Sequence, residues 1–256
     1  MGPSHDRDVV IGGARGYSSG MRVVELGGLR VWVAGGTDRE GGGQGPVVVL
    51  LHGFGAPGDD LASLWRVLRA PSGTRFVFPE APLSLASLGM PGARAWWMID
   101  MMRLQRMRTA AEIEQLMTEV PAGLPAAREK VLAMLDAVDG ALQPSKVILG
   151  GFSQGAMLSV DVALRTERTP AGVVVMSGAL MAEAEWRPLA AKRVGLPVLQ
   201  SHGTLDQILP FLAGERLAEM LKGAGLAHTW VPFQGQHEIP PPVVDAVGQF
   251  LEAKLS

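Results

Sequence analysis

The stretch KVILGGFSQGAMLSVDVALR, residues 146–165, decides the fold. It opens with the run 146–150, which is typical of a buried strand, and from Ser153 onward its apolar residues follow helical spacing. Between the two lies the pattern G-x-S-x-G, which Gly151, Ser153 and Gly155 complete. The glycines leave room for a tight, strained turn that lifts a serine hydroxyl above a sheet. The stretch therefore predicts a strand–turn–helix unit with Ser153 as the candidate nucleophile.

A second stretch, GYSSG at residues 16–20, matches the same pattern around Ser18. It has no buried strand before it, and a strand pattern rather than a helix follows it. The first 20 residues are rich in glycine, serine and charge, which is typical of a flexible N-terminal arm. Ser18 is therefore interpreted as a chance match.

Short apolar strands alternate with helices on both sides of the serine unit. Strands are expected at 47–51, 75–78, 171–176, 196–202 and 228–233, and helices at about 59–69, 125–140, 210–222 and 241–254. This alternation predicts an α/β fold with a mostly parallel central sheet and helices on both faces. Upstream, MRVVELGGLRVWVAG at 21–35 predicts an N-terminal β-hairpin that turns at Gly27 and Gly28. Nothing marks a second domain, so 21–256 is expected to form one.

A serine hydroxyl is a weak nucleophile, so it needs a histidine base and a carboxylate that orients the histidine. When the serine follows a strand in this way, the acid and then the histidine come later in the chain. Asp206 in SHGTLDQILP follows a predicted strand, and His237 in FQGQHEIP lies between the last strand and the last helix. The sequence therefore predicts Ser153, Asp206 and His237 as a catalytic triad.

The remaining histidines and two further aspartates suit these roles less well. The histidines are His5 and His52, which precede the serine, His202, which lies too close to Asp206 along the chain, and His228, which begins a strand. Asp161 and Asp245 fall within predicted helices, where they are expected to be solvated.

Acyl transfer at a serine also requires N–H donors for the oxyanion. One candidate is the backbone N–H of Gln154, at the start of a helix whose dipole adds to the effect. The second is the N–H of Phe54 in LLHGFGAPGDD, the glycine-rich loop after 47–51. His52 in this loop is interpreted as structural, and the loop lacks the lysine and glycine spacing of a phosphate site.

Composition narrows the possible partners and cofactors. The net charge of −2 offers no basic surface for nucleic acid, and the absence of cysteine excludes thiolate chemistry and disulfides. No apolar run approaches the roughly 18 residues that span a membrane, so no stable membrane insertion is expected. The first residues lack the pattern of a signal peptide, which favours a cytoplasmic location. The predicted chemistry needs neither a metal nor an organic cofactor.

Five blocks, LHGFGAPGDD, FPEAP, GGFSQGAM, HGTLDQILP and GQHEIP, together resemble the phospholipase/carboxylesterase family, which includes acyl-protein thioesterases. The resemblance runs from about residue 45 to 250 with the blocks in family order. It implies a compact α/β-hydrolase without a cofactor, and it assigns the triad and oxyanion roles to the same five residues. Two details depart from the family pattern: the acids after the oxyanion loop come late, at Asp59 and Asp60, and Gln236 precedes His237.

RAWWMID, residues 94–100, resembles a tryptophan–aromatic pair of the family's acyl pocket, so Trp96 and Trp97 are candidate substrate-binding residues, with core packing as the alternative. The segment 98–123 is rich in methionine, which suits an adaptable apolar surface. It is expected to form a cap over the site, although a packed helix or a homodimer interface would fit too. The predicted function is a carboxylesterase for small-molecule esters or thioesters with short to medium acyl chains. Acyl-protein thioesterase, lysophospholipase and a non-catalytic binding protein are the alternatives.

Overall fold

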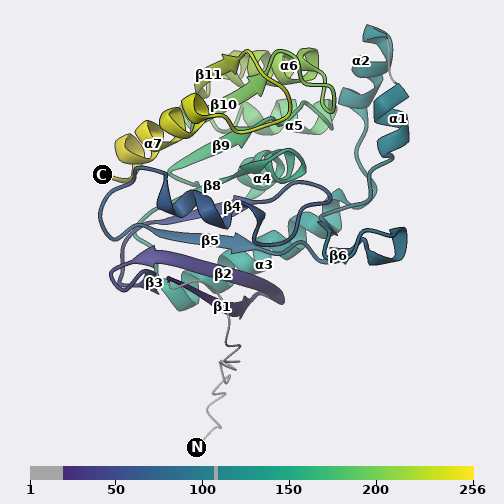
Figure 1. Cartoon of the computed structure of the whole chain (residues 1–256). Coiled ribbons are helices and arrows are strands. Elements are labelled where there is room, and N and C mark those ends of the chain that lie inside the picture. The colour runs from purple at the N-terminus through teal and green to yellow at the C-terminus, as the bar shows by residue number, and fades with distance from the viewer. Residues whose placement is uncertain (1–19, 107–108) are drawn as a thin grey trace, which may run out of the picture.

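The computed structural model of this protein describes residues 20–106 and 109–256. The expected N-terminal arm up to residue 19, and with it Ser18, lies outside the described residues, as do Met107 and Arg108 of the expected cap. Figure 1 shows the described part as a central sheet flanked by helices.

The sheet has nine strands in the order β1-β2-β5-β4-β8-β9-β10-β11, with β3 paired to β2. The strands are β1 (Met21–Leu26), β2 (Leu29–Gly36), β3 (Glu40–Gly42), β4 (Val47–Leu51), β5 (Arg75–Pro79), β8 (Val147–Phe152), β9 (Gly172–Met176), β10 (Pro197–Gly203) and β11 (Ala227–Phe233). The β1–β2 and β2–β5 pairs are antiparallel and all other pairs are parallel. The predicted mostly parallel sheet with an N-terminal hairpin is thus confirmed.

Helices cover both faces of the sheet because successive strand residues point to opposite sides. Val47, Val49 and Leu51 belong to a core shared with α3 (Leu124–Leu142), α4 (Gln154–Arg165), α5 (Glu183–Ala190) and α6 (Phe211–Gly223). Val48 and Leu50 face the other core, which the 3₁₀ helix η1 (Asp60–Arg66) and α7 (Pro241–Leu255) complete. The unbroken apolar run predicted as a strand is buried on both faces for this reason.

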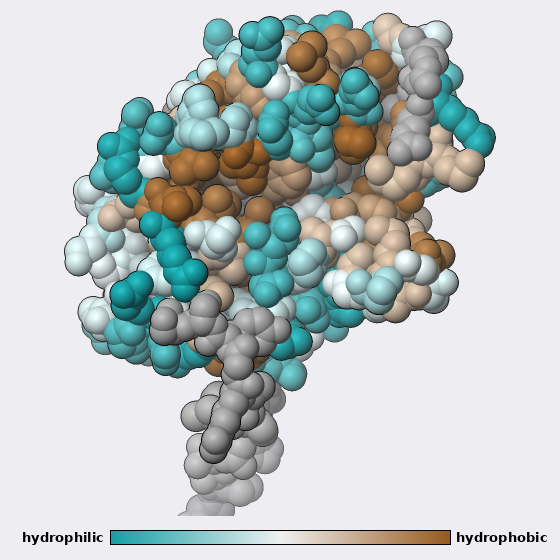
Figure 2. Space-filling model, viewed as in Figure 1, coloured by the Kyte–Doolittle hydropathy of each residue, from teal (hydrophilic) through white to brown (hydrophobic). Residues whose placement is uncertain are grey.

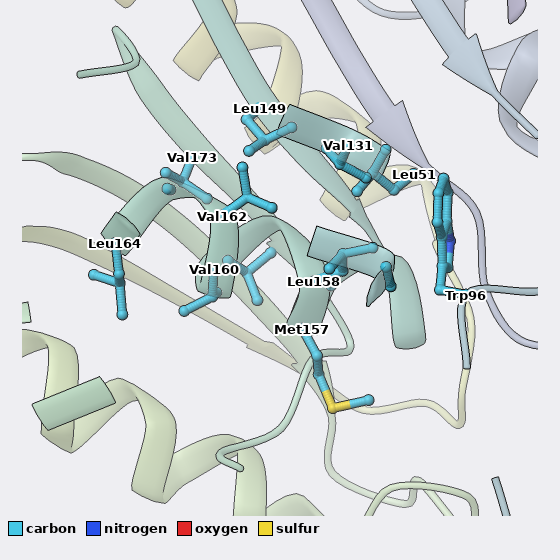
Figure 3. Close-up of a cluster of buried hydrophobic side chains, with 14 of the residues drawn as sticks. Leu51, Trp96, Val131, Leu149, Met157, Leu158, Val160, Val162, Leu164 and Val173 are labelled. Carbon is cyan, nitrogen blue, oxygen red and sulfur yellow. The ribbon is translucent and has the colours of Figure 1, made fainter. Parts of the chain in front are cut away.

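Helix α4 packs closely against the sheet. A Cβ on Gly155 would overlap the carbonyl oxygen of Leu51, and a Cβ on Gly151 would lie 2.5 Å from the same atom. The two glycines of the serine motif therefore bring the N-terminus of α4 against β4. Further along α4, Leu158 and Val162 belong to the same buried cluster as Leu149 of β8 and Val131 of α3 (Figure 3).

Several elements differ from the sequence prediction. The expected helix 59–69 is the shorter η1, and α5, which contains Pro188, was not predicted. A small second sheet pairs β6 (Leu83–Ser84) with β7 (Arg94–Ala95), and η2 (Ala86–Leu88) lies between them. The segment after it holds α1 (Met101–Arg106) and α2 (Ala110–Thr118), whose start carries a capping box between Thr109 and Glu112.

The expected solvation of Asp161 was wrong. Its side chain is fully buried in α4 and forms ion pairs with Arg128 at 2.8 Å and with Arg165 at 3.1 Å. The indole N–H of Trp186 donates to the same carboxylate at 2.8 Å. A buried carboxylate needs such partners, and here they join α3, α4 and α5. Asp245 is exposed on α7, as expected.

Candidate active site

The carboxyl ends of the parallel strands meet at one edge of the sheet, and the predicted site residues follow four of them. Phe54 comes after β4, Ser153 after β8, Asp206 after β10 and His237 after β11. Residues far apart in the chain are thus gathered on one side of the sheet, where ligands of open α/β sheets bind.

Ser153 occupies a strained turn between β8 and α4. Its backbone has φ 55° and ψ −118°, a conformation that few residues other than glycine adopt. Its N–H donates to the Met176 carbonyl at 2.9 Å, which ties the turn to β9. The turn presents Ser153 to a cavity of about 230 Å³ that His237 also lines. Ser153 thus lies on a strained turn and lines the same cavity as His237; its role as a nucleophile stays a prediction.

His237 is paired with Asp206. The ring Nδ1 lies 2.7 Å from Oδ2 of Asp206, whose side chain is fully buried. Burial would raise the pKa of the Asp206 carboxyl, but hydrogen bonds from His202 and His237 and the N–H of Leu209 hold it well below its ordinary value. The carboxylate therefore stays ionised and fixes the His237 ring, which also packs against Phe152 with 4.7 Å between ring centroids.

Two backbone N–H groups beside Ser153 have no acceptor among the described residues: those of Phe54 and Gln154. A backbone hydrogen bond fixes the loop that holds Phe54: the Gly55 N–H donates to the Arg94 carbonyl at 2.9 Å. Phe54 lines the same cavity as Ser153, and Gln154 is the first residue of α4. Both N–H groups are therefore candidate donors to an oxyanion that forms at Ser153.

His52 supports this loop from the interior. Its Nδ1 lies 2.8 Å from the Gly53 carbonyl, and its Nε2 accepts the Ala81 N–H at 3.1 Å. These partners define the tautomer with the proton on Nδ1. Burial lowers the pKa of His52 to about 4, so the ring is neutral near pH 7. His52 is thus a structural residue of the loop, in line with the sequence interpretation.

Gln154 has a second function through its side chain. Its amide oxygen accepts the Trp96 N–H at 2.9 Å, and its amide nitrogen donates to the Trp97 carbonyl at 2.8 Å. Trp96 in turn donates its indole N–H to the His52 carbonyl at 3.0 Å and is 2 % exposed. Trp96 does not line the cavity that Ser153 and His237 share. Its hydrogen bonds instead hold Trp96 and Trp97 in place from within the core.

Trp97 lines a second cavity of about 270 Å³. This cavity shares four wall residues with the serine cavity: Ile99, Leu104, Met157 and Leu209. Its other walls come from 98–104 and 116–122, with Ala179, Leu180 and Met181 from the loop after β9. The two cavities therefore adjoin, and a mostly apolar space leads away from Ser153. We call this space the acyl chamber.

The outer part of the acyl chamber is bounded by an ion pair. Arg103 of α1 and Glu119, directly after α2, form a bidentate pair with both distances 2.6 Å. Large apolar side chains are exposed nearby on the same segment, Met98, Met102 and Val120, and on the β6–β7 hairpin, Leu83, Leu88 and Met90. Figure 2 shows apolar residues over this end of the molecule.

Sequence reasoning missed His202 and the chamber walls outside the tryptophan segment. His202 was set aside as a base because it lies close to Asp206 in the chain, yet it contacts that carboxylate. Met157 and Leu209 were unremarkable apolar residues, and only their position next to Ser153 or Asp206 pointed to the site.

The sheet, the strained serine and the paired histidine define the class of protein, an α/β-hydrolase. The sequence profile of the phospholipase/carboxylesterase family matches residues 40–255. Acyl-protein thioesterase 1 of Gibberella zeae is 28% identical over 218 residues, covering 81% of this chain and 90% of that protein. Its counterpart in Cryptococcus neoformans is 30% identical over 184 residues, covering 68% and 71%.

Solved structures agree with this result. The crystal structure of esterase PE8 superposes with a TM-score of 0.72 at 28% identity, covering 87% of this chain and 97% of that one. Zea mays acyl-protein thioesterase 2 shares the fold, with a TM-score of 0.66 at 23% identity and coverage of 89% and 99%. The chain therefore belongs to the phospholipase/carboxylesterase family and is a carboxylic ester hydrolase.

Neither a metal centre nor a membrane span is found in the part of the chain that the structure describes. Residues 20–106 and 109–256 contain no group of three or more potential metal ligands. No helix in the same ranges has both the length and the apolar character to cross a membrane.

Proposed function

We propose that Ser153, His237 and Asp206 hydrolyse carboxylic esters or thioesters through an acyl-enzyme intermediate. The observation that carries this proposal is the 2.7 Å contact between His237 Nδ1 and the buried Asp206 carboxylate, in a cavity shared with Ser153. Because the Nδ1–H of His237 donates a hydrogen bond to Asp206, the proton stays on Nδ1 and the lone pair of Nε2 is available to receive a proton.

The reaction follows from these roles. His237 takes the Ser153 proton while Oγ attacks the acyl carbon, and the N–H groups of Phe54 and Gln154 stabilise the oxyanion that forms. The imidazolium then gives its proton to the leaving alcohol or thiol as the acyl-enzyme forms. A water molecule, activated by His237, repeats the attack, and the acid is released as Ser153 regains its proton.

The acyl chamber would hold the acyl group of the substrate. Trp97, Met157 and Leu209 supply apolar walls, and the 98–123 segment closes one side, which supports its interpretation as a cap. Trp96, predicted as a substrate contact, is assigned an indirect role because its indole is buried against His52. A chamber of this size suits short to medium acyl chains of a small-molecule ester.

Two proteins named as acyl-protein thioesterases are similar over most of this chain, so thioesters of acylated proteins form the second candidate substrate class. A panel of ester and thioester substrates with increasing acyl length separates the candidates. Preference for short to medium esters supports the carboxylesterase, and preference for acylated peptides or lysophospholipids supports the alternatives. A cytoplasmic location and a homodimer stay predictions, which cell fractionation and sedimentation analysis would test.

A fluorophosphonate probe tests the catalytic proposal most directly. The probe reacts only with an activated serine, so it should label wild-type protein at Ser153 and leave Ser153→Ala unlabelled. A non-catalytic binding protein with the same fold would take up no label.

A further inference from the structure

A second histidine touches the carboxylate of Asp206. His202 Nε2 lies 3.3 Å from Oδ2, the same oxygen that faces His237, and the side chains of His202 and Asp206 are both fully buried. The other oxygen, Oδ1, accepts the N–H groups of Ile208 and Leu209, each at 2.9 Å. Oδ1 is thus held by the backbone and Oδ2 by two imidazole rings.

His202 also ties together the segments around Asp206. Its Nε2 lies 2.9 Å from the Leu209 carbonyl, and its Nδ1 lies 3.2 Å from the Gly178 carbonyl in the loop after β9. Because Leu209 gives its N–H to Asp206 and its carbonyl to His202, these three residues form a closed ring of contacts. Leu209 is at the same time a wall of the serine cavity.

The helix that covers His202 is built to make room for it. A Cβ on Gly214 in α6 would lie 2.5 Å from His202 Nδ1. Glycine is less favourable than alanine inside a helix, so a glycine here gives up helix stability to leave room for the ring. By contrast, a Cβ on Gly223 at the end of α6 would meet nothing within 4 Å.

We propose that His202 is a positioning residue for the reaction: it fixes the rotation of the Asp206 carboxylate so that Oδ2 meets His237. Without His202, His237 would be the one remaining side-chain partner of Oδ2 in the described part of the chain, and the His237 side chain is 15% exposed. Apart from His237, only the two N–H groups on Oδ1 would then oppose rotation about the Cβ–Cγ bond, so the His237 ring would be held less firmly in its orientation toward Ser153. This inference rests on the proposed function of the triad.

Two substitutions at His202 separate its nitrogens. In His202→Asn the amide nitrogen replaces Nδ1 and the contact with Asp206 is lost, whereas in His202→Gln it replaces Nε2 and the contact is kept. We expect kcat to fall about 10- to 100-fold in His202→Asn with little change in KM, since a hydrogen bond to a charged group is removed. His202→Gln should recover most of the loss.

His228 supplies the matched control. It lies on β11, and its Nε2 contacts Gln200 at 2.9 Å rather than any residue of the serine cavity. His228→Asn should therefore leave kcat unchanged. A spectroscopic readout complements the kinetics: the low-field proton resonance of the His237–Asp206 hydrogen bond should shift or broaden in His202→Asn and stay in place in His228→Asn.

Gly214→Ala tests the same idea without altering His202, which matters if His202→Asn does not fold. The added methyl group displaces the ring, so kcat should fall, while Gly223→Ala in the same helix should leave it unchanged. If His202→Asn folds and keeps the wild-type kcat, the proposal is overturned. If His202→Asn does not fold, a wild-type kcat in Gly214→Ala overturns it. Neither result affects the proposed triad. Absence of fluorophosphonate labelling of wild-type Ser153 overturns the proposed function and this inference together.

Discussion

At the scale of single residues, the Asp206 side chain and the Ser153 backbone are each fixed by hydrogen bonds to their neighbours. Asp206 has four hydrogen-bonding partners, His237, His202, Ile208 and Leu209. The strained Ser153 backbone is held by β9 through the Met176 carbonyl. Strain of this kind persists only when its surroundings fix it, so Ser153, the proposed nucleophile, is positioned before substrate binds.

Loss of a triad member should abolish most activity without unfolding the protein. We expect Ser153→Ala and His237→Ala to lower kcat about 10⁴- to 10⁶-fold, and Asp206→Asn about 10⁴-fold, measured with a short-chain ester. Ser18→Ala is the control and should retain full activity. If Ser18→Ala were inactive and Ser153→Ala active, the assignment of the elbow would be wrong.

At the scale of elements, α4 connects Ser153, the proposed nucleophile, to the core. Its N-terminus touches β4 through glycine, and its middle carries the buried Asp161 that joins it to α3 and α5. The same helix therefore presents Ser153 and anchors two other helices, α3 and α5, on one face of the sheet.

Two glycine-to-alanine substitutions should have opposite effects on stability. In Gly155→Ala the new methyl group would overlap the Leu51 carbonyl oxygen, so α4 must move, and we expect a loss of about 3 kcal/mol or more. At Gly140 in α3, a Cβ would have no neighbour within 4 Å, and Gly140→Ala should stabilise by about 0.5–1 kcal/mol. Urea unfolding of both variants measures the difference. Equal effects would contradict the packing described for α4.

Removing the buried carboxylate should be costly as well. Asp161→Ala leaves Arg128 and Arg165 without their shared partner, and we expect about 3–5 kcal/mol of destabilisation in urea unfolding. Asp245→Ala on the exposed face of α7 is the control and should change stability by less than about 0.5 kcal/mol. A small effect of Asp161→Ala would show that the cluster adds little to the fold.

The cap segment should set the acyl-chain preference. Trp97→Ala enlarges the acyl chamber, so the optimum of kcat/KM should move to longer chains. Each added methylene that is buried should raise kcat/KM by up to about fourfold.

The ion pair at the outer end of the chamber should also affect the preference. Arg103→Glu should open this end and broaden the preference, and the double exchange Arg103→Glu with Glu119→Arg should restore it. Arg216→Glu, which breaks a surface pair on α6, is the control. A chain-length profile unchanged by Trp97→Ala and Arg103→Glu would place the acyl group elsewhere.

At the scale of the whole molecule, buried titratable groups should make the fold sensitive to acid. Burial lowers the pKa values of His52 and His228 to about 4, so both stay neutral in the fold while the unfolded chain takes up protons below about 6.5. The unfolded state then binds more protons, and stability falls as the pH drops from about 6.5 to 4. Asp206, whose pKa is lowered, adds a further loss below about pH 4.

This prediction can be measured by urea unfolding at about pH 7 and pH 5. His52 should account for up to about 2 kcal/mol of the loss between these values. His52→Asn should therefore show a smaller loss than wild type, although it is less stable at neutral pH. An equal loss in both proteins would mean that His52 is not the neutral, buried group described above.

Local patterns determined the sheet, four of its flanking helices (α3, α4, α6 and α7) and the three triad candidates. Buried parallel strands are apolar throughout, and a serine between two glycines after such a strand has few other structural roles. The order of Ser153, Asp206 and His237 along the chain follows from the order of the strands. These features depend on near neighbours in the sequence, which is why they were predictable.

Only the tertiary structure decided what surrounds those residues. Asp161 looked solvated because a helical position does not say which neighbours cover it, and Trp96 looked like a substrate contact because nothing local placed Gln154 and His52 against it. His202 lies only four residues before Asp206, which argues against a role as the base. In the folded chain, however, its ring contacts the Asp206 carboxylate. Burial, shared cavities and contacts across the sheet arise between segments far apart in the chain, and no local pattern records them.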